Sequence, residues 1–337
     1  MKIEGTVLRG PEFEPVEGRV VVEDGTIAAV EEASVDSDDV ILPAFVNAHT
    51  HIGDSIAKEA GEGLDLDALV APPDGLKHQL LREASREEKV EAMRRSIRLM
   101  ETTGTTSFLE FREGGVEGVY MLREASSGSS VAPVILGRET ADAMEAADGF
   151  GASGARDGDF SYERNATARE EKLFGIHAGE RDATDINPAL DLDPDFLVHM
   201  VHPETLHLER LEDSGIPVVV CPRSNLVTGV GTPPIAELVE RTTVALGTDN
   251  VMLNSPSMFR EMEFAAKLAD VTAREVLRMA TLNGARIAGL NCGVVEEGHD
   301  AKLLVLDGDS DNLAGVQNVV RAVVRRAGAS DVKEVLL

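Results

Sequence analysis

Cysteine, tryptophan and long apolar runs are scarce or absent in this 337-residue chain. The two cysteines, Cys221 and Cys292, are too few for a disulfide framework, so a reducing cytoplasm is the expected location. No run approaches the roughly 20 apolar residues of a membrane span, and the first residues lack the apolar core of a signal peptide. Tryptophan is absent and aromatic residues make up 4% of the chain, which leaves few rings to stack on a flat substrate; Phe45, Phe111 and Phe259 are the candidates.

Basic charge is also in short supply. Sixty acidic side chains face 32 lysines and arginines, which gives a formal net charge of −28. Because a polyanion gains nothing from so acidic a surface, we expect neither nucleic acid nor an anionic membrane as a partner. The acid is spread over short segments such as residues 35–39 and 191–195. An acidic surface with few lysines is typical of a halophilic protein; the alternatives are a regulatory role of the acid-rich segments, or chance.

Short apolar runs alternate with helix-like stretches along most of the chain. The runs lie before His49 and at residues 104–111, 129–138, 147–153, 171–180, 195–202, 216–225 and 244–250. Apolar strands alternating with helices predict a parallel sheet with helices on its outer face. Eight such strands predict an α/β fold built as a closed (β/α)8 TIM-type barrel, with its active site where the strands end.

Both ends of the chain have a different pattern, and one interval has a clear helical period. Residues 1–42 alternate apolar and polar positions, with a hairpin turn expected at Asp24 and Gly25. Strand character returns at about residue 293. We therefore expect a small composite β domain from residues 1–42 plus 293–337, and a barrel over 43–292. The clearest helix spans 85–104 and ends at a glycine suited to a C-cap.

Histidines and a carboxylate lie at the ends of several predicted barrel strands. His49 and His51 follow the first strand on the same side, because residues i and i+2 of a strand share a face. His177 belongs to the fifth strand and Asp249 to the eighth, and strand ends converge in a barrel. Three imidazoles and a carboxylate suit one divalent transition ion, zinc or ferrous iron, with a position left for water. His199 ends the sixth strand.

Six segments in a fixed order carry a family resemblance. They are NAHTHIGD, IHAGE, LVHMVHPE, CPRSN, LGTDN and ATLNGARIAGL. Together they resemble the amidohydrolase superfamily, and within it the branch that deaminates cytosine, guanine and adenosine-type nucleosides such as S-adenosylhomocysteine. The resemblance covers almost the whole chain. It implies a metal-dependent aminohydrolase whose metal ligands are His49, His51, His177 and Asp249.

The same resemblance implies the catalytic residues. Glu180, three residues after His177, matches the proton-shuttling glutamate, and the alternative is a helix-entry residue. His199 matches the histidine that orients the attacking water, with His202 as its competitor. Asp249, which contacts both metal and water, can accept the first proton. These roles agree with general acid–base chemistry, since an amine leaves poorly unless it is protonated.

The chain departs from the family pattern in ways that bear on substrate and metal. It is short for this branch, and no lysine lies between Lys89 and Lys172, so a bridging carboxylated lysine is absent. Glu110 and Glu139 could replace it, but we expect a mononuclear site. Substrate contacts are predicted from residues near the strand ends, namely Arg112, Glu139 and Asn225.

Other residues near the predicted mouth have two interpretations. Arg112 or Arg138 could bind an anionic substrate group or form an ion pair with a nearby glutamate. Lys77 and His78, in the segment 71–80, could reach the substrate or lie on an exposed loop. The glycine-rich segment 113–119 lacks the spacing of a phosphate-binding loop and is interpreted as a turn.

The sequence predicts an enzyme with a small-molecule substrate and an expected tendency to form homo-oligomers. The predicted reaction replaces an exocyclic amine of a purine, pyrimidine or related ring by oxygen and releases ammonia. One alternative is hydrolysis of a cyclic amide, an imidazolone or a ring halide on the same scaffold. A second alternative is a barrel that binds a ligand without turning it over.

Overall fold

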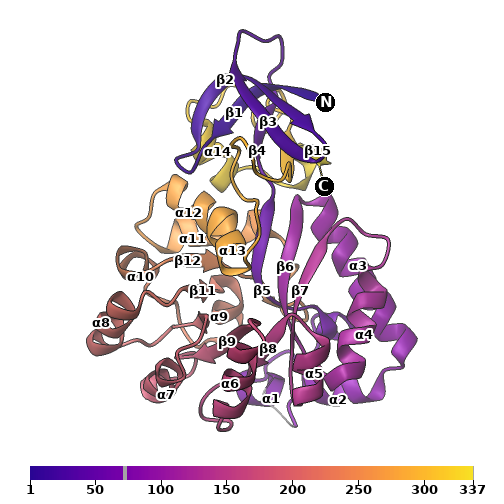
Figure 1. The fold of residues 1–337 in the computed structure, drawn as a ribbon, viewed down its shortest axis with the longest axis vertical. Helices are drawn as coiled ribbons and strands as arrows, with labels where there is room; N and C mark the ends of the chain where they lie inside the picture. The colour runs from indigo at the N-terminus through magenta and orange to yellow at the C-terminus, as the bar shows by residue number, and fades with distance from the viewer. Residues whose placement is uncertain (71–73, 337) are drawn as a thin grey trace.

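A curled parallel sheet of nine strands forms the centre of the computed structural model, which describes residues 1–70 and 74–336 (Figure 1). The order across this sheet is β12-β11-β10-β9-β8-β7-β6-β5-β13, and every neighbouring pair is parallel. Its strands are β5 (Phe45–His51), β6 (Thr105–Arg112), β7 (Ala132–Gly137), β8 (Gly149–Ala152), β9 (Leu173–Ala178), β10 (Phe196–His199), β11 (Val218–Val220), β12 (Val244–Leu246) and β13 (Asp249–Asn250). The predicted α/β class and the parallel sheet are confirmed.

The two edges of this sheet are close in the sequence. Strand β12 forms one edge and β13 the other, and only Gly247 and Thr248 separate them along the chain. Asp249 and Asn250 of β13 pair with Thr50 and His51 of the first strand, β5. This curled arrangement is of the kind found in TIM-like barrels.

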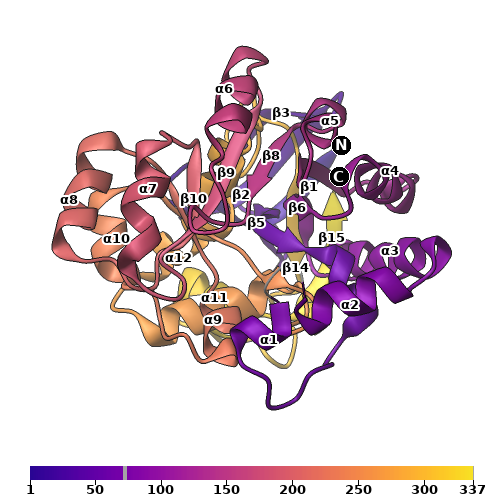
Figure 2. The ribbon, with the colours of Figure 1, turned by 90° about the horizontal axis from the view of Figure 1, so that it is seen from below.

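Helices surround the curled sheet and connect its strands (Figure 2). Between β5 and β9 they are η1 (Ile52–Ala57), α1 (Leu66–Val70), α2 (Leu76–Glu83), α3 (Arg86–Thr102), α4 (Gly115–Ser126), α5 (Ala141–Ala146) and α6 (Ser161–Arg169). Between β9 and β13 they are η2 (Ala183–Asp185), α7 (Ile186–Asp191), α8 (Thr205–Ser214), α9 (Pro222–Thr228) and α10 (Ile235–Arg241). After β13 follow α11 (Met258–Leu268), α12 (Ala273–Ala280) and α13 (Leu282–Ile287).

Helix α3 shows how the local sequence sets these helices. Ser85 and Glu88 form a reciprocal capping box that satisfies backbone N–H groups at its start. Gly104, at φ 84°, follows its last residues and adopts the left-handed conformation that ends many helices. The predicted helix over 85–104 is therefore confirmed. Among the helices of the described residues, none is long and apolar enough to cross a membrane.

A second sheet joins segments from both ends of the chain and lies above the nine-stranded sheet in Figure 1. It contains β1 (Lys2–Arg9), β2 (Glu14–Glu23), β3 (Thr26–Glu32), β4 (Val40–Pro43), β14 (Leu303–Leu306) and β15 (Val332–Leu336). Helix α14 (Val319–Arg325) and the turn η3 (Ala329–Asp331) precede β15. The β2–β3 hairpin turns at Asp24 and Gly25, both at positive φ, as predicted. The division of the chain into domains at residues 42 and 293 stays a prediction.

Side chains fill the space inside the curled sheet beneath the strand ends. Phe111 and Phe196 are fully buried there. Two glycines make room for these rings, because a Cβ at Gly151 would lie 2.6 Å from Phe111 and one at Gly175 would lie 2.4 Å from Phe196. The interior is thus a packed core, and the polar side chains at the strand ends stand on it.

Candidate metal centre and active site

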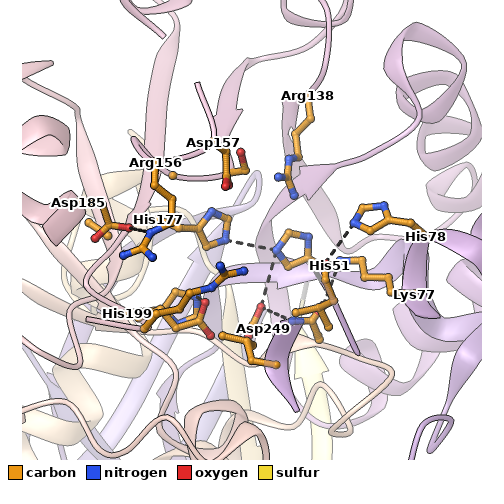
Figure 3. Close-up of a pocket in the computed structure, with 18 residues that line it drawn as sticks. His51, Lys77, His78, Arg138, Arg156, Asp157, His177, Asp185, His199 and Asp249 are labelled. Carbon is orange, nitrogen blue, oxygen red and sulfur yellow. Dashed lines mark hydrogen bonds and ion pairs between the residues drawn. The ribbon is translucent and has the colours of Figure 1, made fainter. Parts of the chain in front are cut away.

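A cavity of about 80 Å³ opens where the parallel strands end, and acidic, basic and imidazole side chains surround it (Figure 3). It is lined by His51, Leu66, Val70, Lys77, His78, Arg138, Ser153, Gly154, Arg156, Asp157, His177, Ala178, Glu180, Arg181, Asp185, His199, Asp249 and Asn250. No aromatic side chain other than histidine is among these described residues. The predicted stacking rings lie elsewhere: Phe45 and Phe111 are fully buried and Phe259 is 4% exposed.

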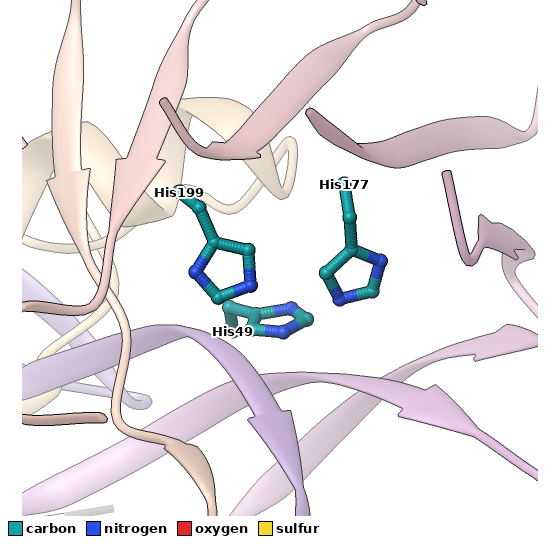
Figure 4. Close-up of side chains that lie close together, drawn as sticks. All are labelled: His49, His177 and His199. Atoms are coloured by element: carbon teal, nitrogen blue, oxygen red, sulfur yellow. The ribbon is translucent and has the colours of Figure 1, made fainter. Parts of the chain in front are cut away.

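Histidines from three strands meet beside this cavity. His49 of β5, His177 of β9 and His199 of β10 face one another (Figure 4), and their ligand atoms lie within 4.8 Å of one another. Two further groups that share residues with this one have ligand atoms equally close to one another. They are His49 and His51 with Asp249, and Glu180 and His199 with Asp249. The structure thus brings together the four residues predicted to bind the metal with Glu180 and His199, the predicted catalytic residues.

Hydrogen bonds fix the orientation of two of these rings. Nδ1 of His177 lies 2.8 Å from the carbonyl oxygen of Ala152, so this nitrogen carries the proton and donates it. Nδ1 of His51 lies 2.8 Å from Oε1 of Glu113 and 3.1 Å from the carbonyl oxygen of Phe111. In both rings Nε2 therefore keeps its lone pair, and the two Nε2 atoms are 3.5 Å apart. This is the arrangement of metal-binding histidines, whose second nitrogen is held by a carbonyl or carboxylate.

His49 is the residue whose surroundings most directly suit a cation. It is fully buried, and neither of its ring nitrogens has a hydrogen-bond partner among the described residues. Nε2 lies 3.4 Å from Oδ1 of Asp249. A buried polar atom without a partner is costly, and a cation between the imidazoles and the carboxylate would satisfy it. Burial lowers the pKa of His49 and His177, and lowers that of His51 to about 3, so all three rings are neutral at pH 7, the form in which an imidazole can bind a metal.

Asp249 is held in one orientation by its neighbours. It adopts the left-handed conformation at φ 56°, and Oγ of Ser224 donates to its Oδ2 at 2.5 Å. Nδ2 of Asn250 donates to its Oδ1 at 3.0 Å. Burial opposes its charge, but the nearby imidazoles of His49, His199 and His51 hold the pKa of Asp249 well below its usual range. Asp249 is therefore an anion directed into the histidine cluster.

Glu180 lies beside the histidine–aspartate cluster, and its carboxylate is within 4.8 Å of ligand atoms of His199 and Asp249. It follows β9 after a turn at Gly179, which has φ 65°. Its Oε2 is 3.6 Å from Nε2 of His199, and its side chain is 20% exposed. Burial raises its pKa, which favours a carboxyl group that can hold and release a proton. His202, the alternative to His199, is not among the described residues that line the cavity.

The three predicted substrate contacts lie away from the cavity lining. Arg112 is 1% exposed. Its guanidinium group packs directly against Gly53, because a Cβ at Gly53 would lie only 1.6 Å from its Nη1. It forms ion pairs with Glu110 at 3.7 Å and Glu113 at 3.6 Å, so the ion-pair interpretation of this arginine is confirmed. Glu139 is exposed and accepts from the backbone N–H of Gly114. These positions give no support to substrate contact by Arg112 or Glu139.

Asn225 is the third predicted substrate contact, and its side chain faces His199. Its side chain is fully buried, and its Nδ2 lies 3.2 Å from Nδ1 of His199. Glu110, a candidate bridging ligand in the sequence, also faces away from the cavity. It accepts hydrogen bonds from the hydroxyl of Thr50 at 2.7 Å and the backbone N–H of Ile52 at 2.8 Å.

Sequence reasoning missed Glu113, which connects several groups of the site. Its Oε1 is 2.7 Å from Nζ of Lys77, 2.8 Å from Nδ1 of His51 and 3.2 Å from Nη1 of Arg138. Burial opposes its ionisation, but Lys77 and the other cations hold its pKa well below the usual range. An acidic residue directly after a strand that ends at the mouth was the available signal, but the glycines that follow it suggested a turn.

Lys77 reaches the cavity from helix α2, as one interpretation of the segment 71–80 held. It is 3% exposed, and its Nζ also donates to Oδ1 of Asn250 at 3.0 Å. His78 lines the cavity as well, whereas residues 71–73 of that segment lie outside the described residues. Through Glu113 and Asn250, Lys77 is connected to both His51 and Asp249.

Comparisons with known proteins agree with this geometry. The model of the amidohydrolase family matches residues 40–190 and 178–335. A provisionally named aminohydrolase of Methanothermobacter thermautotrophicus is 37% identical over 349 residues, with 90% of each chain covered. A 5-methylthioadenosine/S-adenosylhomocysteine deaminase of Halobacterium salinarum is 28% identical over 399 residues, covering 100% of this chain and 90% of that one.

A solved structure has the same fold. The zinc-containing crystal structure of an adenosine deaminase from Xanthomonas campestris superposes with a TM-score of 0.77 at 21% identity. The alignment covers 100% of this chain and 91% of that one.

Proposed function

The chain belongs to the amidohydrolase family, and we propose that it is a metal-dependent aminohydrolase that removes the exocyclic amine of a nitrogen heterocycle. The observation that carries this proposal is the meeting, at one cavity, of a histidine–aspartate cluster with Glu180. A metal cluster alone would fit many hydrolases. A carboxyl group of raised pKa beside it is what protonation of a departing amine requires.

We assign His49, His51, His177 and Asp249 as the ligands of one divalent ion, with zinc as the expected metal. The donor set of three imidazoles and one carboxylate fits zinc and leaves a position for water. When bound, the ion supplies Lewis acidity, which lowers the pKa of a coordinated water toward about 7. Zinc in the superposed adenosine deaminase structure supports this choice.

The protein's own residues then move the protons. A carboxylate oxygen of Asp249 accepts a proton from the attacking water, because this carboxylate is an anion at neutral pH. His199 donates a hydrogen bond to the oxygen that gains charge at the reacting carbon. Glu180 protonates a ring nitrogen, takes up the remaining proton of the attacking water and delivers it to the departing amine, and the proton held by Asp249 then returns Glu180 to its starting state. Water and the amino heterocycle are thereby converted to the hydroxy (keto) heterocycle and ammonia.

Incubation of metal-loaded protein with amino-purines, amino-pyrimidines, pterins and cyclic amides, followed by mass spectrometry and an ammonia assay, tests the proposal. Deamination gives a product one mass unit heavier than its parent, with one ammonia per product. A gain of a whole water would instead establish ring opening. No turnover of any amino heterocycle, with the ion bound, would overturn the proposal. Glu209→Gln, at an exposed glutamate of α8, is the matched control for Glu180→Gln.

The finer features of the fold belong to the same proposal. We propose that β12 and β13 together form the eighth strand, so that the sheet closes as a (β/α)8 barrel over residues 43–292. Pairing of β13 with β5 supports this closure. The six-stranded sheet of terminal segments supports a composite β domain of residues 1–42 plus 293–337. Limited proteolysis should cut near residues 42 and 293 and leave a stable fragment over 43–292; preferential cleavage inside 43–292 would contradict these bounds.

We further propose that the enzyme works in a salt-rich cytoplasm on a small-molecule substrate, with homo-oligomers expected. The net charge of −28 and the similarity to a protein of Halobacterium salinarum support the salt adaptation. Unfolding midpoints measured from low to molar potassium chloride should rise, because salt screens the repulsion among surface carboxylates. A flat or falling trend would contradict this proposal.

A further inference from the structure

Three consecutive residues at the start of α9 each contact a different buried group. Helix α9 begins directly after β11, with Pro222 in its first turn. Arg223 is anchored by Glu261 of α11, whose carboxylate accepts from its backbone N–H at 3.0 Å and from its Nε at 2.5 Å. With the turn anchored in this way, Ser224 contacts Asp249 and Asn225 contacts His199.

The contact between Asn225 and His199 determines which ring nitrogen carries the proton. Nδ2 of Asn225 can only donate, so Nδ1 of His199 must accept at 3.2 Å. In a neutral imidazole the proton is then on Nε2. This Nε2 is the atom that faces Oε2 of Glu180, at 3.6 Å.

The amide orientation of Asn225 has a physical reason. As placed, its Oδ1 is buried without a hydrogen-bond partner among the described residues. If the amide were reversed, the two N–H groups of the NH2 would occupy that position without an acceptor. Buried donors without partners are rarer in proteins than under-satisfied carbonyl oxygens, so the orientation that donates to His199 is favoured.

We propose that Asn225 is a positioning residue that holds His199 in the Nε2–H tautomer, so that His199 donates a hydrogen bond and does not ligate the metal. This inference rests on the proposed function, in which His199 donates that hydrogen bond to the oxygen that gains charge during the reaction. The tautomer leaves His199 with no free lone pair, because Nδ1 faces Asn225 and Nε2 carries the proton. Of the three overlapping candidate groups, the structure therefore assigns the metal to the one with His49, His51 and Asp249, and not to either of the two that include His199.

Exchange of Asn225 for an aspartate of the same shape reverses the hydrogen bond. The carboxylate of Asn225→Asp can only accept, so it draws the proton to Nδ1 and frees Nε2 as a lone pair. With 15N-labelled histidine, NMR distinguishes the two tautomers, and the His199→Gln spectrum identifies the signals of His199. We expect the wild-type protein to show Nε2–H, with and without zinc, and Asn225→Asp to show the Nδ1–H tautomer.

Zinc binding and turnover give two independent measurements. Zinc should bind more tightly to Asn225→Asp, because His199 becomes able to ligate, while deamination falls about 10²-fold through loss of one donor to the developing oxyanion. Asn187→Asp adds the same charge at an exposed site and should change neither quantity. Circular dichroism confirms that each variant is folded.

The wild-type spectrum alone can overturn the proposal, even if Asn225→Asp does not fold. A proton on Nδ1 of His199 in the wild-type protein, or a zinc-dependent shift of its Nε2 that indicates ligation, would contradict it. Unchanged tautomer and zinc affinity in folded Asn225→Asp would contradict it as well. These readouts need no turnover, so failure of the proposed deamination is distinguishable from failure of this inference.

Discussion

Exchange of Glu113 for glutamine tests how the site holds its metal. Glu113 does not reach the metal cluster itself, but its Oε1 is 2.8 Å from Nδ1 of His51 and orients that ring. Loss of such an outer carboxylate reduces metal affinity by about 10- to 100-fold, which corresponds to about 1.4–2.7 kcal/mol. We expect the loss of zinc affinity in Glu113→Gln to lie within this range. It should not be larger, because the carbonyl oxygen of Phe111, 3.1 Å from Nδ1 of His51, can still accept from the same N–H.

The same exchange should also lower stability. Lys77 is 3% exposed and loses the anion at 2.7 Å from its Nζ, while Arg138 loses its partner at 3.2 Å. Removing one partner of a buried ion pair costs about 3–5 kcal/mol, and we take this as an upper bound because the amide oxygen can still accept from the ammonium group.

Competition with a chelator of known affinity measures the zinc dissociation constant, and chemical denaturation of the metal-free protein measures stability. Glu117→Gln, at an exposed glutamate of α4, is the control. Unchanged zinc affinity in folded Glu113→Gln would refute the assignment of His51 as a ligand oriented by Glu113.

Two further exchanges test the buried charges around the site. Glu261→Gln leaves Arg223 buried without its anion, so we expect the free energy of unfolding to fall by about 3 kcal/mol; an unchanged denaturation midpoint would contradict this. Burial raises the pKa of Glu110 from 4.5 to about 7, so the folded state binds more protons than the unfolded state between these values. Stability should therefore fall as pH rises from 4.5 to 7. Glu110→Gln should reduce this dependence of stability on pH. An equal pH dependence in the variant and the wild-type protein would refute the raised pKa of Glu110.

The strand and helix pattern could be predicted because it depends on local sequence. Apolar runs alternating with periodic helices indicated the parallel sheet, and the pair Asp24-Gly25 indicated a turn that needs positive φ at both residues. The histidine positions at strand ends followed from the same pattern. Convergence of parallel strand ends then predicted that His49 and His177 would meet.

The substrate contacts could not be predicted because they depend on which side of a strand or turn each residue faces. Glu110 and Arg112 alternate with Phe111 along β6, so when Phe111 fills the interior, both charged residues face the surrounding η1 and α4 segments. Asn225 was placed at the end of a strand, but β11 ends at Val220 and Pro222 begins a helix. Proline in a first helical turn was the signal for that boundary.

The role of Glu113 depends on tertiary contacts that local sequence does not determine. Its cationic partners come from helix α2 and from the residue after β7, 36 positions before and 25 positions after it. Their separation in sequence gives no periodic pattern. Only the folded chain shows that one buried carboxylate contacts Lys77, Arg138 and His51.

The exchange Glu180→Gln, with zinc content and deamination measured on the same sample, tests the central claim most directly. Glu180 is assigned to proton transfer and not to metal binding, so the variant should retain the zinc stoichiometry of the wild-type protein. Its turnover of any amino heterocycle that the wild-type protein deaminates should fall by about 10²–10⁴-fold. Full activity in zinc-loaded Glu180→Gln, or loss of zinc together with activity, would contradict the account.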